Sequence, residues 1–124
     1  MASYTGDIML DTSFIFVGEE DLERLSGFHT MPTRHYYDDD DIESINETLK
    51  EIKKNLSEDN IHVETKEEAL ELAQLSSQDL EKKFNISKDS AYFDLSNLAT
   101  YYMGCLILEV IEKKGHCEFY SDEF

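Results

Sequence analysis

The sequence predicts a mainly α-helical single domain spanning residues 1–124, a compact bundle of four to five helices around a central apolar helix at about 95–114. The first observation behind this prediction is that residues 95–108 carry no charge, although 31% of the chain is charged. A helix that is apolar on nearly all sides is buried in a core or a bilayer. A membrane span needs about 18 to 20 such residues, so we favour a core.

The second observation is an amphipathic pattern between residues 42 and 56. Its apolar residues recur in steps of three and four, which is the period of one helix face. They are Ile42, Ile45, Leu49, Ile52 and Leu56. A single proline and five glycines also argue against a loop-rich or all-β fold.

The ends of the central helix carry local signals. We expect Asp94 to cap its N-terminus through a side-chain oxygen. Lys113 and Lys114 suit the last turn, where the helix dipole favours cations, and Gly115 suits the left-handed residue that follows. Gly104 lies in mid-helix, where glycine costs about 1 kcal/mol relative to alanine. We therefore expect another helix to cross closely at Gly104.

The N-terminal third is less regular. Residues 13–17 (FIFV at 14–17) are compatible with a buried strand or with the first turn of a helix that continues through 19–25. Residues 27–37 contain the only proline, Pro32, and are predicted to form a long loop. Residues 116–120 alternate weakly in polarity, which predicts a short strand that pairs with 13–17 if both are extended.

The region between the helices predicted at 42–56 and 95–114 contains further helical segments. Thr65 and Glu68 form a capping-box pattern, so a helix begins after Thr65. The segment up to Phe84 is either one kinked helix or two short ones, and Asn85 is the expected stop. Residues 87–93 are predicted to be a linker whose Tyr92 and Phe93 pack beneath the central helix.

The charge is the most informative property for function. There are 28 acidic residues against 11 Lys and Arg, which gives a formal net charge of −17. Such a field repels nucleic acids and anionic membranes and attracts basic proteins. No basic and apolar leader pattern occurs at residues 1–10, and the two cysteines do not form a disulfide framework, so we expect a cytoplasmic protein.

No pattern predicts chemistry, so we expect no catalytic, cofactor-binding or metal-ligating residues. An EF-hand loop starting at Asp38 would need glycine at its sixth position and glutamate at its twelfth, where Glu43 and Leu49 stand. The histidines and cysteines lack zinc-ligand spacing. Cys105 is expected to be buried in an apolar helix of an acidic protein, which is the wrong environment for a reactive thiolate.

One stretch has the composition of a protein-binding surface. Tyrosine offers a large contact area with a polar tip, and adjacent carboxylates attract and pair with basic side chains. We name this stretch the Tyr/Asp patch; it comprises Tyr36, Tyr37, Asp38, Asp39, Asp40, Asp41 and Glu43. The competing interpretation is a loop followed by acids that cap a helix.

With this size, this charge and the Tyr/Asp patch, the chain resembles the immunity proteins of bacterial toxin systems. The resemblance implies a non-catalytic inhibitor that binds and neutralises a basic toxin domain, for which a nuclease is one candidate, with the Tyr/Asp patch covering a basic cleft. Two alternatives remain: a nucleic-acid-mimicking inhibitor of the anti-restriction or phage type, and a helical adaptor or regulatory subunit. The sequence indicates no oligomeric state.

Overall fold

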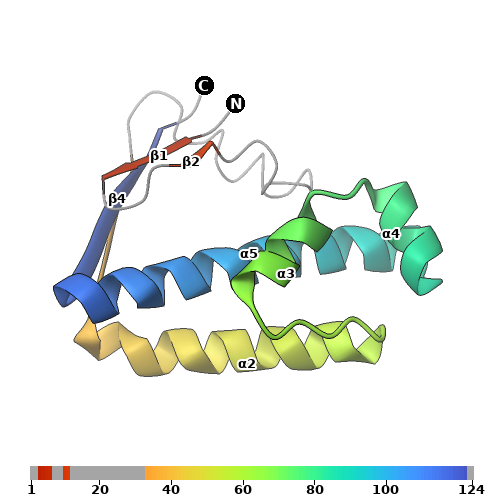
Figure 1. The fold of residues 1–124 in the computed structure, drawn as a ribbon, viewed down its shortest axis with the longest axis horizontal. Helices are drawn as coiled ribbons and strands as arrows, with labels where there is room; N and C mark the ends of the chain where they lie inside the picture. Colours follow the sequence, from red (N-terminus) through yellow and green to blue (C-terminus); the bar gives the residue numbers. More distant parts are fainter. Residues whose placement is uncertain (1–2, 7–9, 12–32, 123–124) are drawn as a thin grey trace.

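A computed structural model describes residues 3–6, 10–11 and 33–122 of the chain. Four α-helices make up most of this part, and a small antiparallel sheet packs at one end of them (Figure 1). The helices are α2 (Ile42–Glu58), α3 (Lys66–Ala73), α4 (Ser77–Phe84) and α5 (Lys88–Lys114). The predicted class, mainly helical with a small β element, is confirmed.

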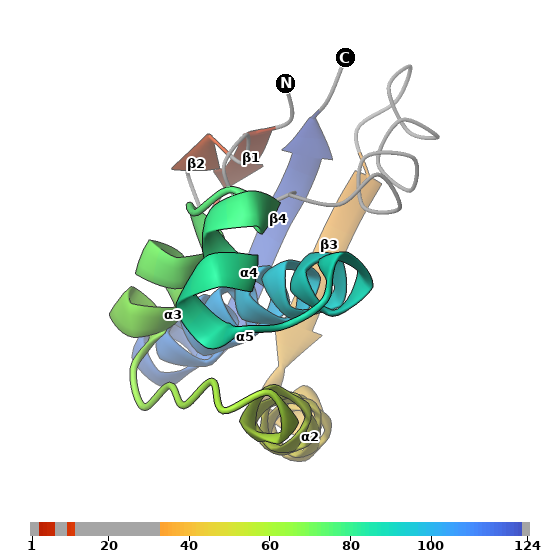
Figure 2. The ribbon, with the colours of Figure 1, turned by 90° about the vertical axis from the view of Figure 1, so that its right-hand side faces the viewer.

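The central apolar helix is α5, which contacts α2, α3, α4 and two strands. Figure 2 looks nearly along its axis and shows α2 on one side of it and the short α3 and α4 on another. The main core forms where α2 and α3 meet α5. Its fully buried members include Leu56, Ile61, Leu80, Leu95 and Leu98. In the described part of the chain, no helix is both long and apolar enough to cross a membrane.

The predicted start of α5 is wrong. The helix begins at Lys88, not near Leu95, because the Ser87 side chain accepts a hydrogen bond from the Ser90 backbone N–H at 3.1 Å. Asp94 is therefore not an N-cap but a buried residue inside the helix. The predicted linker at 87–93 is helical apart from its cap, Ser87. Its aromatic residues face outward instead of packing beneath α5, with Tyr92 and Phe93 40% and 61% exposed.

Most other helix ends follow the sequence signals. Thr65 caps α3 by accepting a hydrogen bond from the Glu68 backbone N–H at 3.2 Å. Ser76 caps α4, so the segment to Phe84 is two short helices. Asn85 and Gly115 end α4 and α5 with positive φ angles of 54° and 84°.

The sheet has the strand order β2-β1-β4-β3, and all neighbours are antiparallel. Its strands are β1 (Ser3–Gly6), β2 (Leu10–Asp11), β3 (Thr33–Asp38) and β4 (His116–Asp122). The strand predicted at 116–120 is confirmed as β4. Its partners are β1 and β3. The proposed partner at 13–17 and the expected helix at 19–25 lie outside the described residues.

The loop predicted at 27–37 is wrong from Thr33 onward, while residues 27–32 lie outside the described part. Residues 33–38 form β3, with His35 opposite Phe119 and Asp38 opposite His116. A strand stabilised by a partner at the other end of the sequence leaves little local signal, because its backbone hydrogen bonds are made with that distant partner.

Candidate protein-binding surface

The Tyr/Asp patch spans the junction between the sheet and the helices. Tyr36, Tyr37 and Asp38 end β3, Asp39–Asp41 form a short 3-10 helix, and Glu43 lies in the first turn of α2. The sequence thus turns from strand to helix within the patch. Its residues are adjacent in the chain, and they fall into two groups by burial.

The two tyrosines have different roles because neighbouring strand residues point to opposite faces. Tyr36 is 45% exposed, and its ring stacks on His116 of β4 with centroids 5.9 Å apart. Tyr37 packs against a small apolar cluster that contains Ile107, Ile111 and Cys117. Burial, and then the charge of Asp41, raises the pKa of the Tyr37 phenol. Tyr36 is therefore the tyrosine placed to meet a partner.

Two of the four aspartates hold the turn together. The Asp38 side chain accepts a hydrogen bond from the Asp40 backbone N–H, and Asp41 accepts one from the Asp38 backbone N–H, both at 2.9 Å. This reciprocal arrangement is a capping box. Asp39, Asp40 and Glu43 are exposed. The patch thus offers a partner Tyr36 and three carboxylates, while its other members stabilise the fold.

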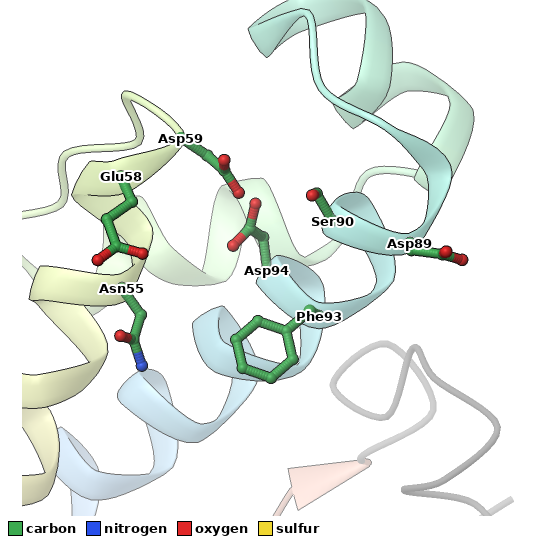
Figure 3. A pocket seen from close by; sticks show the side chains of 7 residues that line it. All are labelled: Asn55, Glu58, Asp59, Asp89, Ser90, Phe93 and Asp94. Atoms are coloured by element: carbon green, nitrogen blue, oxygen red, sulfur yellow. The ribbon is translucent and has the colours of Figure 1, made fainter.

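A second acidic site lies at the opposite end of α2, where sequence analysis predicted nothing. A pocket of about 380 Å³ opens between the last turn of α2 and the first turns of α5 (Figure 3). The 17 residues of α2 place it about 25 Å from the Tyr/Asp patch, at 1.5 Å per residue. We call it the acidic pocket; its lining consists of Asn55, Glu58, Asp59, Asp89, Ser90, Phe93 and Asp94.

Asp94 is the unusual member of the acidic pocket. It is 1% exposed, and its Oδ2 accepts no hydrogen bond from any residue that the structure describes. Its carboxyl group points toward that of Asp59 (Figure 3). Burial, together with hydrogen bonding to Asp59 and repulsion between the two charges, raises the pKa of Asp94 to about 8. Asp94 is thus protonated near neutral pH and is poised to share its proton with Asp59.

A signal for this site was present in the sequence. Asp94 lies three residues after Ala91 and four before Leu98, so it falls on the apolar stripe of α5. A charged residue on a core-facing stripe is costly unless it is paired or protonated. Because Asp94 immediately precedes the uncharged residues 95–108, the sequence instead suggested that it is the N-cap of the central helix. The contribution of Asp59 has no local signal, because it depends on how α2 packs against α5.

The chemistry open to the acidic pocket is limited by how deeply Asp94 lies. A general acid must touch the atom that it protonates, and Asp94 Oδ2 is shielded at the floor of the pocket. Charge, by contrast, acts across several ångströms. Within the described residues, no group of three His, Cys, Asp or Glu side chains is arranged to hold a metal ion. The arrangement therefore suits binding of an organic cation better than proton transfer.

Neither cysteine lines the acidic pocket, but Cys117 packs with Tyr37 of the Tyr/Asp patch. Cys105 is half-buried on α5, and burial, followed by the charge of Glu109, raises the pKa of its thiol. Cys117 is fully buried in β4. A raised thiol pKa lowers the thiolate fraction at neutral pH.

Comparison with known proteins places the chain in no group. No protein-family model matches it, and searches of curated proteins and of solved structures find no significant match either.

Proposed function

We propose that this chain is a cytoplasmic, non-catalytic inhibitor that binds and neutralises a basic toxin domain, with a nuclease as one candidate. The observation that carries the proposal is the group formed by Asp39, Asp40 and Glu43, three exposed carboxylates that follow the exposed Tyr36 closely in the chain. Aromatic residues supply contact area in interfaces, and carboxylates steer a basic partner toward them. The net charge of −17 extends this attraction beyond the contact itself.

The nucleic-acid-mimic alternative has less support. Glu43, Glu47 and Glu51 are exposed at four-residue intervals along α2, about 6 Å apart along its axis. This acidic row lies next to lysines of the same helix: Lys50, Lys53 and Lys54. A mimic needs a continuous row of negative charge, and these lysines interrupt it.

The test of the biological role is co-expression. The chain is produced in a bacterial host together with the product of each gene next to its own, and colony formation is counted. We expect one neighbouring product to be toxic alone and harmless with this chain. If no neighbouring product is toxic, the toxin-neutralising role is wrong. It is also wrong if the purified chain inhibits several unrelated DNA-binding proteins and if its binding to all of them is lost as the salt concentration is raised.

The test of the surface uses the resulting pair. The variant D39N/D40N/E43Q removes three exposed charges and leaves the capping box of Asp38 and Asp41 intact. We expect its association rate to fall about tenfold or more at low salt. The matched control is E51Q/E71Q/E112Q, which removes three exposed charges elsewhere. Equal association rates for the two variants would show that the Tyr/Asp patch does not guide the partner.

A further inference from the structure

The acidic pocket lies between two helices that pack side by side in antiparallel directions (Figure 1). Asn55, Glu58 and Asp59 come from the C-terminal end of α2, and the remaining lining residues come from the N-terminal turns of α5. The carboxylates of Glu58 and Asp59 lie around the opening and that of Asp94 lies at the floor, while Asp89 lies at the outer edge (Figure 3). The lining contains no Lys, Arg or His among the described residues.

The nearest lysine on α5 is engaged elsewhere. The Lys88 ammonium lies 5.9 Å from the centre of the Tyr92 ring, on a different helix face from the pocket-lining Asp89, Ser90, Phe93 and Asp94. The pocket therefore holds unbalanced negative charge. The C-terminus of α2 and the N-terminus of α5 bring opposite partial charges to the pocket, so its negative charge comes from the carboxylates and not from the helix dipoles.

Asp94 supplies an observation independent of the acidic cluster. Its side chain is buried, faces the pocket, and has an oxygen without a hydrogen-bond donor among the described residues. A buried polar atom without a partner destabilises the fold. Either of two changes would stabilise the Asp94 carboxyl group. It can share a proton with Asp59, or a cation that enters the pocket can stabilise its ionised form.

We propose that the acidic pocket receives an arginine side chain of a basic protein partner, and that the guanidinium charge, acting across the pocket, favours the ionised form of Asp94 and so displaces the proton that it shares with Asp59. Phe93 favours arginine over lysine. Its ring is 61% exposed at the edge of the pocket, and a guanidinium stacks on an aromatic face and is less strongly hydrated than an ammonium. Glu58 and Asp59 are placed to accept its N–H groups.

The exchange makes binding depend on pH. The charged groups nearest Asp94 in the pocket are Glu58 at the end of α2 and Asp59, its C-cap, while Asp89 of α5 points away from Asp94 (Figure 3). Helices α3 and α4 also pack on α5 but contribute no lining residue. One proton leaves Asp94 for each guanidinium bound. Linkage then predicts that the affinity for the guanidinium increases as pH is raised, by up to about tenfold per pH unit, until pH reaches the pKa of Asp94. Above that pKa the affinity no longer changes with pH.

The inference relies on the proposed function only for the source of the arginine. The pocket itself is tested with a free probe, Nα-acetyl-arginine amide, titrated into the full chain and followed by the amide NMR signals. We expect the largest changes at residues 55–59 and 89–94, with tighter binding above the pKa of Asp94. Nα-acetyl-lysine amide should bind more weakly, and calcium and magnesium should not compete.

Three variants complete the test. D94N should abolish the pH dependence and weaken binding, and E58Q should weaken binding while keeping the pH dependence. E71Q, which removes one exposed charge outside the pocket, should change neither. Absence of changes at the pocket amides, tighter binding of a divalent metal than of arginine, or an unaltered pH dependence in D94N would each overturn the inference.

The probe also separates this inference from the proposed function. The variant D39N/D40N/E43Q should bind the arginine probe like the parent chain. If the probe binds but no toxin partner exists, the pocket stands and the toxin-neutralising role falls. If a toxin is neutralised but the probe does not bind, the toxin-neutralising role stands and the inference about the pocket is wrong.

Discussion

Gly104 of α5 lies directly against Leu49 of α2: a Cβ added at Gly104 would come within 2.6 Å of Leu49 Cδ2 and 3.3 Å of its Cγ. The glycine lets the two long helices approach closely, as its mid-helix position predicted. Leu49 is itself buried, so it has little room to move away.

Gly104→Ala should therefore destabilise the protein. Helix propensity alone would stabilise it by about 1 kcal/mol, but overpacking a tight contact costs about 1–3 kcal/mol. We expect a net loss of about 1 kcal/mol in the free energy of unfolding, measured by urea denaturation. Thr100→Ala, at an exposed position of α5, is the control for propensity. A smaller loss for Gly104→Ala in a Leu49→Ala background would identify the contact as the cause, and a gain in stability for Gly104→Ala alone would contradict it.

Asp94 should make stability depend on pH. Its pKa is about 8 in the folded protein, above the ordinary value of 3.8, so the folded state binds more protons than the unfolded state between these values. The contribution of Asp94 to the free energy of unfolding is therefore most favourable at acidic pH, and it decreases as pH rises toward 8. Asp94→Asn should be more stable than the parent by about 1–3 kcal/mol near neutral pH, because an amide satisfies the site without charge.

The same comparison needs a control on the first turn of α5. Asp89→Asn removes an exposed carboxylate that is favourable to the helix dipole, so it should cost about 0.3–1 kcal/mol. Thermal unfolding of the three proteins is measured from acidic to alkaline pH. Parallel curves for the parent and Asp94→Asn would show that Asp94 does not titrate as described.

Ser87 should be required for the first turns of α5. Its hydroxyl accepts the Ser90 backbone N–H, and loss of such a cap costs about 1 kcal/mol. Ser87→Ala should lower the free energy of unfolding by that amount, and Ser87→Asp should restore most of it. Because these turns form one wall of the acidic pocket, amide exchange at residues 88–94 should also speed up in Ser87→Ala. An unchanged exchange pattern would argue against this role.

The two thiols should react slowly with a disulfide reagent. Cys117 is fully buried, and burial raises the pKa of the half-buried Cys105, so little thiolate is accessible near neutral pH. We expect Cys105 to react several-fold more slowly than a free cysteine and Cys117 to react only upon unfolding. Cys105→Ser and Cys117→Ser assign the two phases. A fast phase that survives in Cys105→Ser would contradict the assignment.

Features specified by nearby residues were predictable from the sequence. The apolar stripe of α2, the cap at Thr65, the stop at Asn85 and the left-handed Gly115 all depend on side chains within a few positions. Features that depend on distant partners were not. Strand β3 needs β4, and the outward direction of Phe93 depends on where α5 begins.

The Tyr/Asp patch and the acidic pocket show the same limit for function. Composition could mark residues 36–43 as acidic and aromatic, but it could not show that Asp38 and Asp41 are occupied by a capping box or that Tyr37 packs inward. The acidic pocket required the packing of α2 on α5, which brings together carboxylates that are far apart in the chain.

The sheet joins strands that are far apart in the sequence, with Ser3 opposite Asp122 and β3 on the other side of β4. Closing so long a loop is entropically costly and slow, whereas the helical contacts lie closer together in sequence. During synthesis β3 emerges from the ribosome well before β4, which is its only strand partner among the described residues. A nascent chain therefore cannot present the finished Tyr/Asp patch, and any activity that depends on it begins only after residues 116–122 have emerged.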